Sequence, residues 1–154
     1  TDLDREFLEW LCSIASVNAA EFTHDFFASG SLLAHNTAVE AINADRKVFE
    51  ENAARVSISH VEESGLDLFA ARKDELCAAL DSLIEIKGYD LALLIVTDIN
   101  SHHSLLLASG NSQIINALVF DRDADGVFQA PGVVSRKKQV FPAVCQAIRI
   151  ASHS

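Results

Sequence analysis

Three consecutive cations, Arg136, Lys137 and Lys138, are the side chains of this sequence best suited to binding chemistry. They lie at the start of a helix predicted over residues 139–151, and no acidic residue follows Asp125. A helix N-terminus already carries partial positive charge, so each exposed cation placed there costs about 0.3–1 kcal/mol. A bound anion would offset this cost, because backbone N–H groups, helix dipole and cations would all face one negative ligand.

The types of these residues favour a phosphate as that anion. Arg136 can grip a phosphate through two parallel N–H bonds, whereas Lys137 acts as a point charge. Gly132 leaves room for close backbone approach, and Ser135 can cap the helix or donate to a phosphate oxygen. The segment can equally be a solvated basic patch, and its local sequence does not choose between the two.

Other residues that could do chemistry form weaker patterns. Asp121, Asp123 and Asp125 imitate the opening of a calcium-binding loop, but the twelfth position is Gly132 instead of a bidentate Glu. We therefore expect an acidic turn between strands. The pair His102-His103 is expected at the surface or at a strand edge, since adjacent strand residues point to opposite faces and suit one metal ion poorly.

The remaining candidates read as structural. Cys12, Cys77 and Cys145 are odd in number and lack CxxC spacing, so we expect core packing and a reducing, cytoplasmic compartment. Glu50-Glu51 and Glu62-Glu63 are expected to be solvated charges at strand edges. We predict no metal site in this chain.

The elements that must position the basic segment alternate between strands and helices. Thr37 to Glu40 reads as a capping box, and Gly88 as the end of the longest helix. The continuous apolar run 91–97 predicts a strand covered on both faces. Predicted strands are 46–50, 55–61, 91–97, 104–108 and 126–128; predicted helices are 4–15, 19–28, 37–44, 66–86, 113–118 and 139–151. Inward positions predicted for the longest helix are Leu68, Ala71, Leu76, Ala79, Leu80 and Leu83.

This order predicts an α/β fold: a mixed sheet of about five strands covered by helices on both faces, in a single domain over residues 1–154. The net charge of −10 argues against nucleic acid and anionic membranes as partners. No apolar run approaches the roughly 18 residues that a membrane span needs. The start at Thr1 and the lack of Met hint at an incomplete chain, although removal of an initiator Met explains the start equally well.

The basic segment also resembles a known motif. Ser135-Arg136-Lys137-Lys138-Gln139 is similar to the Ser-Arg-Lys-Lys-Gln motif in the second domain of the family II inorganic pyrophosphatases. Two weaker segments fall in the family's order. The strand end Val-Thr97-Asp98-Ile resembles its Val-Thr-Asp-Ile, and Asn43-x-Asp45-x-Lys47-x-Phe49 resembles its Asn-x-Asp-x-Lys-x-Phe element. The likeness spans residues 28–148.

The resemblance implies a role for each matching residue. Arg136 and Lys137 would be catalytic and would bind the phosphates of pyrophosphate, with Lys47 as a third contact. Ser135, Lys138 and Gln139 would bind substrate in supporting roles. The resemblance assigns no role to Asp98.

It also implies partners. Manganese (or cobalt or magnesium) would be bound by an N-terminal DHH domain of the same polypeptide, which this sequence lacks, and the complete enzyme could be a homodimer. The isolated chain would be inactive. The alternatives are a related hydrolase of polyphosphate or another phosphoanhydride, and a stand-alone module that binds anions or proteins without catalysis.

Overall fold

A mixed six-stranded sheet forms the centre of the molecule, in the order β1-β2-β3-β4-β6-β5. The computed structural model describes residues 31–152. β2 and β3 run parallel, and the other neighbouring pairs are antiparallel. The helices predicted over 4–15 and 19–28, and Cys12, lie outside the described residues. The strands are β1 (Arg46–Glu51), β2 (Ala54–Glu63), β3 (Leu91–Asp98), β4 (His103–Gly110), β5 (Asp121–Arg122) and β6 (Phe128–Pro131).

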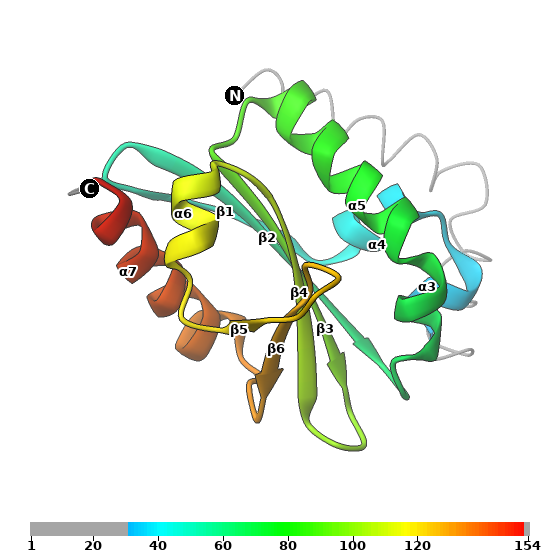
Figure 1. The fold of residues 1–154 in the computed structure, drawn as a ribbon. Helices are drawn as coiled ribbons and strands as arrows, with labels where there is room; N and C mark the ends of the chain where they lie inside the picture. The colour runs from blue at the N-terminus through cyan, green and yellow to red at the C-terminus, as the bar shows by residue number, and fades with distance from the viewer. Residues whose placement is uncertain (1–30, 153–154) are drawn as a thin grey trace.

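Helices cover both faces of the sheet, as predicted. Figure 1 shows α3, α4 and α5 on one face and α6 and α7 on the other. The helices are α3 (Leu32–His35), α4 (Ala38–Ala44), α5 (Asp67–Lys87), α6 (Ser112–Ala117) and α7 (Phe141–Ser152), with a π-helical turn η1 (Arg136–Val140) directly before α7. The α/β fold class is therefore confirmed, with one strand more than the five expected. Within residues 31–152, no helix combines the length and apolar character that crossing a membrane requires.

Two helix ends follow the chemistry predicted from their sequences. Thr37 Oγ1 accepts from the backbone N–H of Glu40, and the Glu40 carboxylate accepts from the N–H of Thr37, which completes the capping box of α4. Gly88 ends α5 in the left-handed conformation, with φ +70°.

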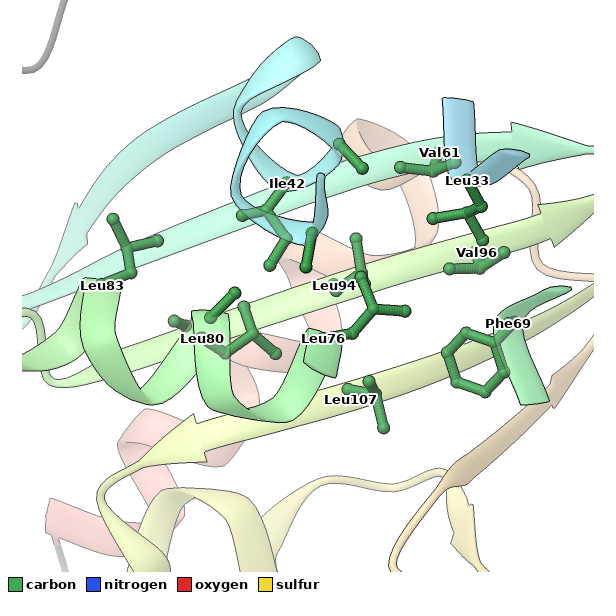
Figure 2. Packing of buried hydrophobic residues seen from close by; sticks show 14 of the residues in the cluster. Leu33, Ile42, Val61, Phe69, Leu76, Leu80, Leu83, Leu94, Val96 and Leu107 are labelled. Carbon is green, nitrogen blue, oxygen red and sulfur yellow. The ribbon is translucent and has the colours of Figure 1, made fainter. Parts of the chain in front are cut away.

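The core beneath α5 is built from leucines of the helix and the sheet. Figure 2 shows Leu76 and Leu80 beside Leu94 of β3, with Leu83 farther along the helix in the same core. The expected inward positions Leu68 and Ala71 are wrong, since both are exposed. Phe69 is buried instead, because positions 69, 76, 80 and 83 form one stripe at helical spacing. The other predicted inward positions are buried.

The opposite core lies between the sheet and α6 and α7. Ile58, Leu93 and Leu106 of three neighbouring strands form this core together with Val140 of η1 and Val144 of α7. β3 contributes to both cores and is buried from residue 91 to residue 97, as its apolar run predicts.

The two cysteines within the described residues are free and belong to the cores. Cys77 packs against the α5 core, and Cys145 is buried. Burial raises the pKa of both thiols, which fits structural cysteines rather than reactive ones.

Glu63 overturns the expectation of a solvated strand-edge charge. It ends β2 and is only 3% exposed. Its carboxylate accepts from Ser31 Oγ at 2.7 Å and from the Leu32 N–H at 3.0 Å. The Glu63 carboxylate thus accepts from N–H groups at the start of α3 that have no partner within the helix. The alternation of residues along β2 cannot reveal this contact, because α3 lies elsewhere in the sequence.

The last strands also depart from prediction. Residues 126 and 127 belong to a turn, and β6 begins at Phe128, where it pairs with the two-residue strand β5. Asp123 Oδ1 accepts from the N–H groups of Asp125 and Val127, so it closes the acidic turn that was expected between strands. These bonds lower the pKa of Asp123.

Candidate phosphate-binding site

Arg136 is held in place by a segment far away in the sequence. Its Nη1 donates to the carbonyl oxygens of Asp45 at 2.8 Å and Ile58 at 3.3 Å, and its Nη2 donates to Asp45 Oδ1 at 2.9 Å. The Arg136 side chain is 10% exposed, against 55% for Asp45. One cation of the segment therefore has an acidic partner, which lies 91 positions earlier in the chain.

These contacts leave part of the guanidinium unused. The group carries five N–H donors, and three are engaged by Asp45 and Ile58. Nε–H and one Nη2–H make no hydrogen bond to any of the residues that the structure describes. A pair of donors of this kind matches the oxygens of a phosphate. Asp45 thus orients the guanidinium and leaves two of its N–H donors free.

Lys47 lies on the same face of the sheet as the basic segment. It is exposed on β1 opposite Ile58, between Asp45, which contacts the basic segment, and Phe49, which contacts the first residue of α7. Asp45 binds Arg136, and the Phe49 ring packs on Phe141 with 4.3 Å between centroids. Because alternate strand residues share a face, Lys47 lies on the same face as Asp45 and Phe49, which is the face toward the basic segment.

The two lysines of the motif remain exposed. The side chains of Lys137 and Lys138 make no hydrogen bond or ion pair within residues 31–152. Both belong to η1, which starts three residues before the helix predicted from residue 139. The basic residues therefore lie inside a helical turn, where backbone geometry fixes their spacing.

Gln139 and Ser135 shape the loop that presents these cations. Gln139 Oε1 accepts from the N–H groups of Val134 at 2.8 Å and Ser135 at 2.9 Å, while its Nε2 donates to Gly132 O at 3.2 Å. Ser135 Oγ accepts from the Lys138 N–H at 3.0 Å. The side-chain amide of Gln139 thus stabilises the loop over residues 132–135 by hydrogen bonds near both of its ends.

A row of polar side chains beside Arg136 was missed by the sequence reasoning. His60 Nε2 lies 2.8 Å from Thr97 Oγ1, which lies 2.7 Å from Ser104 Oγ. Ser104 in turn donates to the carbonyl oxygen of Val133, at the start of the basic loop. The alternation Val56, Ile58, His60 in the sequence already placed His60 on the Ile58 face.

Burial lowers the pKa of His60, and the charge of Arg136 lowers it further, while Glu62 and Asp45 oppose the shift. His60 is therefore neutral at neutral pH. It is the titratable side chain in the row.

The other residues considered from the sequence serve the turns. Asp98 accepts from the Gly65 and Asn100 N–H groups and from Ser101 Oγ, and these bonds lower its pKa. His102 is exposed with φ +59°, and His103 Nε2 lies 2.9 Å from Gln129 Oε1, so the two do not converge. Residues 31–152 contain no group of three or more His, Cys, Asp or Glu that could hold a metal ion.

A known domain family matches most of this chain. The model of the DHHA2 domain matches residues 24–147, which include the basic segment and Lys47. The chain belongs to the DHHA2 domain family. The DHHA2 match ends within α7 and covers every strand of the sheet.

Several relatives of this DHHA2 domain are named as pyrophosphatases. Proteins named as probable manganese-dependent inorganic pyrophosphatases are 30% identical over 149 residues in Clostridium acetobutylicum and 34% identical over 149 residues in Shouchella clausii. Each match covers 96% of this chain and 48% of the relative. A crystal structure of a Methanococcus jannaschii protein assigned to the family II inorganic pyrophosphatases superposes with a TM-score of 0.70 at 31% identity, covering 97% of this chain and 48% of that one. The DHHA2 chain thus spans about half the length of these relatives and corresponds to their C-terminal half.

Proposed function

We propose that this DHHA2 domain binds pyrophosphate and forms the substrate-binding half of a metal-dependent inorganic pyrophosphatase, which hydrolyses diphosphate to two phosphates. The observation that supports it most is the anchored guanidinium of Arg136, which keeps two N–H donors free beside the exposed Lys137 and on the Lys47 face of the sheet. The names of the relatives supply the substrate.

The work of the reaction is divided between two halves. Manganese, bound by an N-terminal DHH domain, would polarise the attacking water and the attacked phosphorus. Arg136 binds oxygens of a terminal phosphate through its unused donors, and Lys137 and Lys47 neutralise charge on the phosphoryl oxygens. Ser135, Lys138 and Gln139 bind substrate in supporting roles, and Ser135 and Gln139 also hold the loop. Closure of the two halves brings these cations onto the substrate.

Binding by the chain itself tests the proposal directly. We expect Lys137→Ala to weaken pyrophosphate binding about tenfold in isothermal titration, the scale of one charge-assisted contact. The Lys137 side chain is exposed and makes no hydrogen bond or ion pair within residues 31–152, so we expect this change to leave the fold intact. Arg149→Ala removes an equal charge from α7, where the side chain is 60% exposed and paired with Glu51. It should bind like the wild type, and equal weakening by both variants would reduce the site to a general charge effect.

A further inference from the structure

His60 and Arg136 converge on one atom. The backbone N–H of His60 donates to the carbonyl oxygen of Asp45 at 3.0 Å, and Arg136 Nη1 donates to the same oxygen at 2.8 Å. The His60 side chain lies on the face of β2 that carries Ile58, whose carbonyl Arg136 also contacts. The imidazole is therefore a neighbour of the guanidinium that the proposed function assigns to phosphate.

The hydrogen-bonded row fixes which nitrogen of His60 carries a proton. The Val133 carbonyl can only accept, so the single hydroxyl hydrogen of Ser104 is donated to it. Ser104 Oγ must then accept from Thr97, and Thr97 Oγ1 must accept from His60 Nε2. Neutral His60 is thus the Nε2–H tautomer, and its Nδ1 is an acceptor without a hydrogen.

Nδ1 of His60 is available to a ligand. It makes no hydrogen bond to any residue between 31 and 152. Within residues 31–152, the buried side-chain polar atoms without a hydrogen-bond partner comprise Ser59 Oγ alone. His60 Nδ1 also lacks a partner but is not among these buried atoms, so it reaches solvent. The charged groups that face the imidazole are Glu62 on the same strand, Asp45 before β1 and Arg136 on η1; β3 contributes Thr97.

We propose that His60 is a further substrate-binding residue, which takes up a proton from solvent at Nδ1 when pyrophosphate binds and then donates to a phosphate oxygen. The inference rests on the proposed function. A phosphate at Arg136 cancels the cationic charge that disfavours imidazolium and places an anion within its reach. Nε2–H stays on Thr97 throughout, so the row holds the ring in one orientation and connects it to the Val133 end of the basic loop.

The lowered pKa of His60 sets the expected pH dependence. Binding should raise this pKa, and by linkage the affinity for pyrophosphate should rise as pH falls below the pKa of the complex. The gain levels off below the pKa of the free chain. Each unit of pKa change corresponds to a tenfold gain in affinity.

The experiment is an NMR titration of the His60 ring nitrogens in the full chain, without and with pyrophosphate, combined with calorimetric affinities across the same pH range. His60→Gln is the matched variant, because its amide nitrogen replaces Nε2 toward Thr97 but offers no titrating Nδ1. Pyrophosphate titrates itself, and this affects both proteins equally. We expect the Nε2–H tautomer in the free chain, a raised His60 pKa in the complex, and an affinity advantage over His60→Gln that grows toward low pH.

The outcomes separate this inference from the proposed function. If pyrophosphate binds and Lys137→Ala weakens it, but the His60 pKa does not move and His60→Gln follows the wild-type pH profile, the inference fails and the proposed function stands. An Nδ1–H tautomer in the free chain also overturns it. If pyrophosphate shifts no resonance of residues 135–139, both proposals fall together.

Discussion

At the scale of single residues, the site depends on how one guanidinium is shared. Asp45 and the Ile58 carbonyl take three donors of Arg136 and leave two, so the same side chain joins the turn before β1 and strand β2 to η1 and keeps two donors for the phosphate that we propose it binds. A salt bridge that is largely exposed on its acidic side adds little to stability. Its effect here is to orient the guanidinium before any ligand arrives.

This division predicts the effect of the two cations on catalysis. In the complete two-domain enzyme, Arg136→Ala or Lys137→Ala should lower turnover at least ~10²-fold, the loss typical of one preorganised electrostatic contact. Steady-state hydrolysis of pyrophosphate measures this, with Arg149→Ala as the charge-matched control. Wild-type rates in both variants would contradict the assignment.

The residues of this site were only partly predictable from the sequence. Arg136, Lys137 and Lys47 stand out because type and motif identify them without coordinates. Asp45 could not be assigned as the partner of Arg136, because the ion pair depends on how β1 and η1 meet in space. The row from His60 to Ser104 joins three strands, and local patterns do not report contacts between strands.

At the scale of elements, the end of β4 is under a tight steric constraint. A Cβ on Gly110 would lie 2.3 Å from the backbone oxygen of Asp90, and Gly110 has φ +120°. That oxygen also accepts from the Asn111 N–H at 2.8 Å, so it cannot move freely. Only glycine fits at this close approach of two chain segments.

Gly110→Ala should therefore lower the free energy of unfolding by well over the ~1 kcal/mol that an alanine at positive φ costs by itself. Gly88→Ala is the control, since its φ is +70° but its added Cβ would meet nothing within 4 Å. Urea unfolding of both variants measures the difference. Equal losses would show that the loop around Asp90 relaxes and that the clash is absent in solution.

Elements with strong periodicity or caps were predicted well, and short ones were not. The capping box at Thr37 predicts the start of α4, and Gly88 predicts the end of α5. The continuous apolar run predicts β3. β5 has two residues and η1 five, too few to show a period. The side of α5 around Phe69 was misjudged because apolar residues at 68, 69 and 71 allow more than one stripe.

At the scale of the whole molecule, the chain corresponds to half of its relatives, and we propose that its cations act on substrate together with a second half. We expect the purified 154-residue chain to bind pyrophosphate but not to hydrolyse it, even with added manganese. Phosphate release measures this, with a complete pyrophosphatase in the same assay as the positive control. Robust hydrolysis by the chain alone would show that it carries its own catalytic metal site.

The position of Lys47 has a consequence for solubility. Among residues 31–152, β1 pairs with β2 on one side only, so its outer backbone groups could recruit a strand from another molecule. Arg46, Lys47, Glu50 and Glu51 give this strand a charge at most positions around Val48 and Phe49. The amine proposed for pyrophosphate therefore also discourages aggregation along that edge.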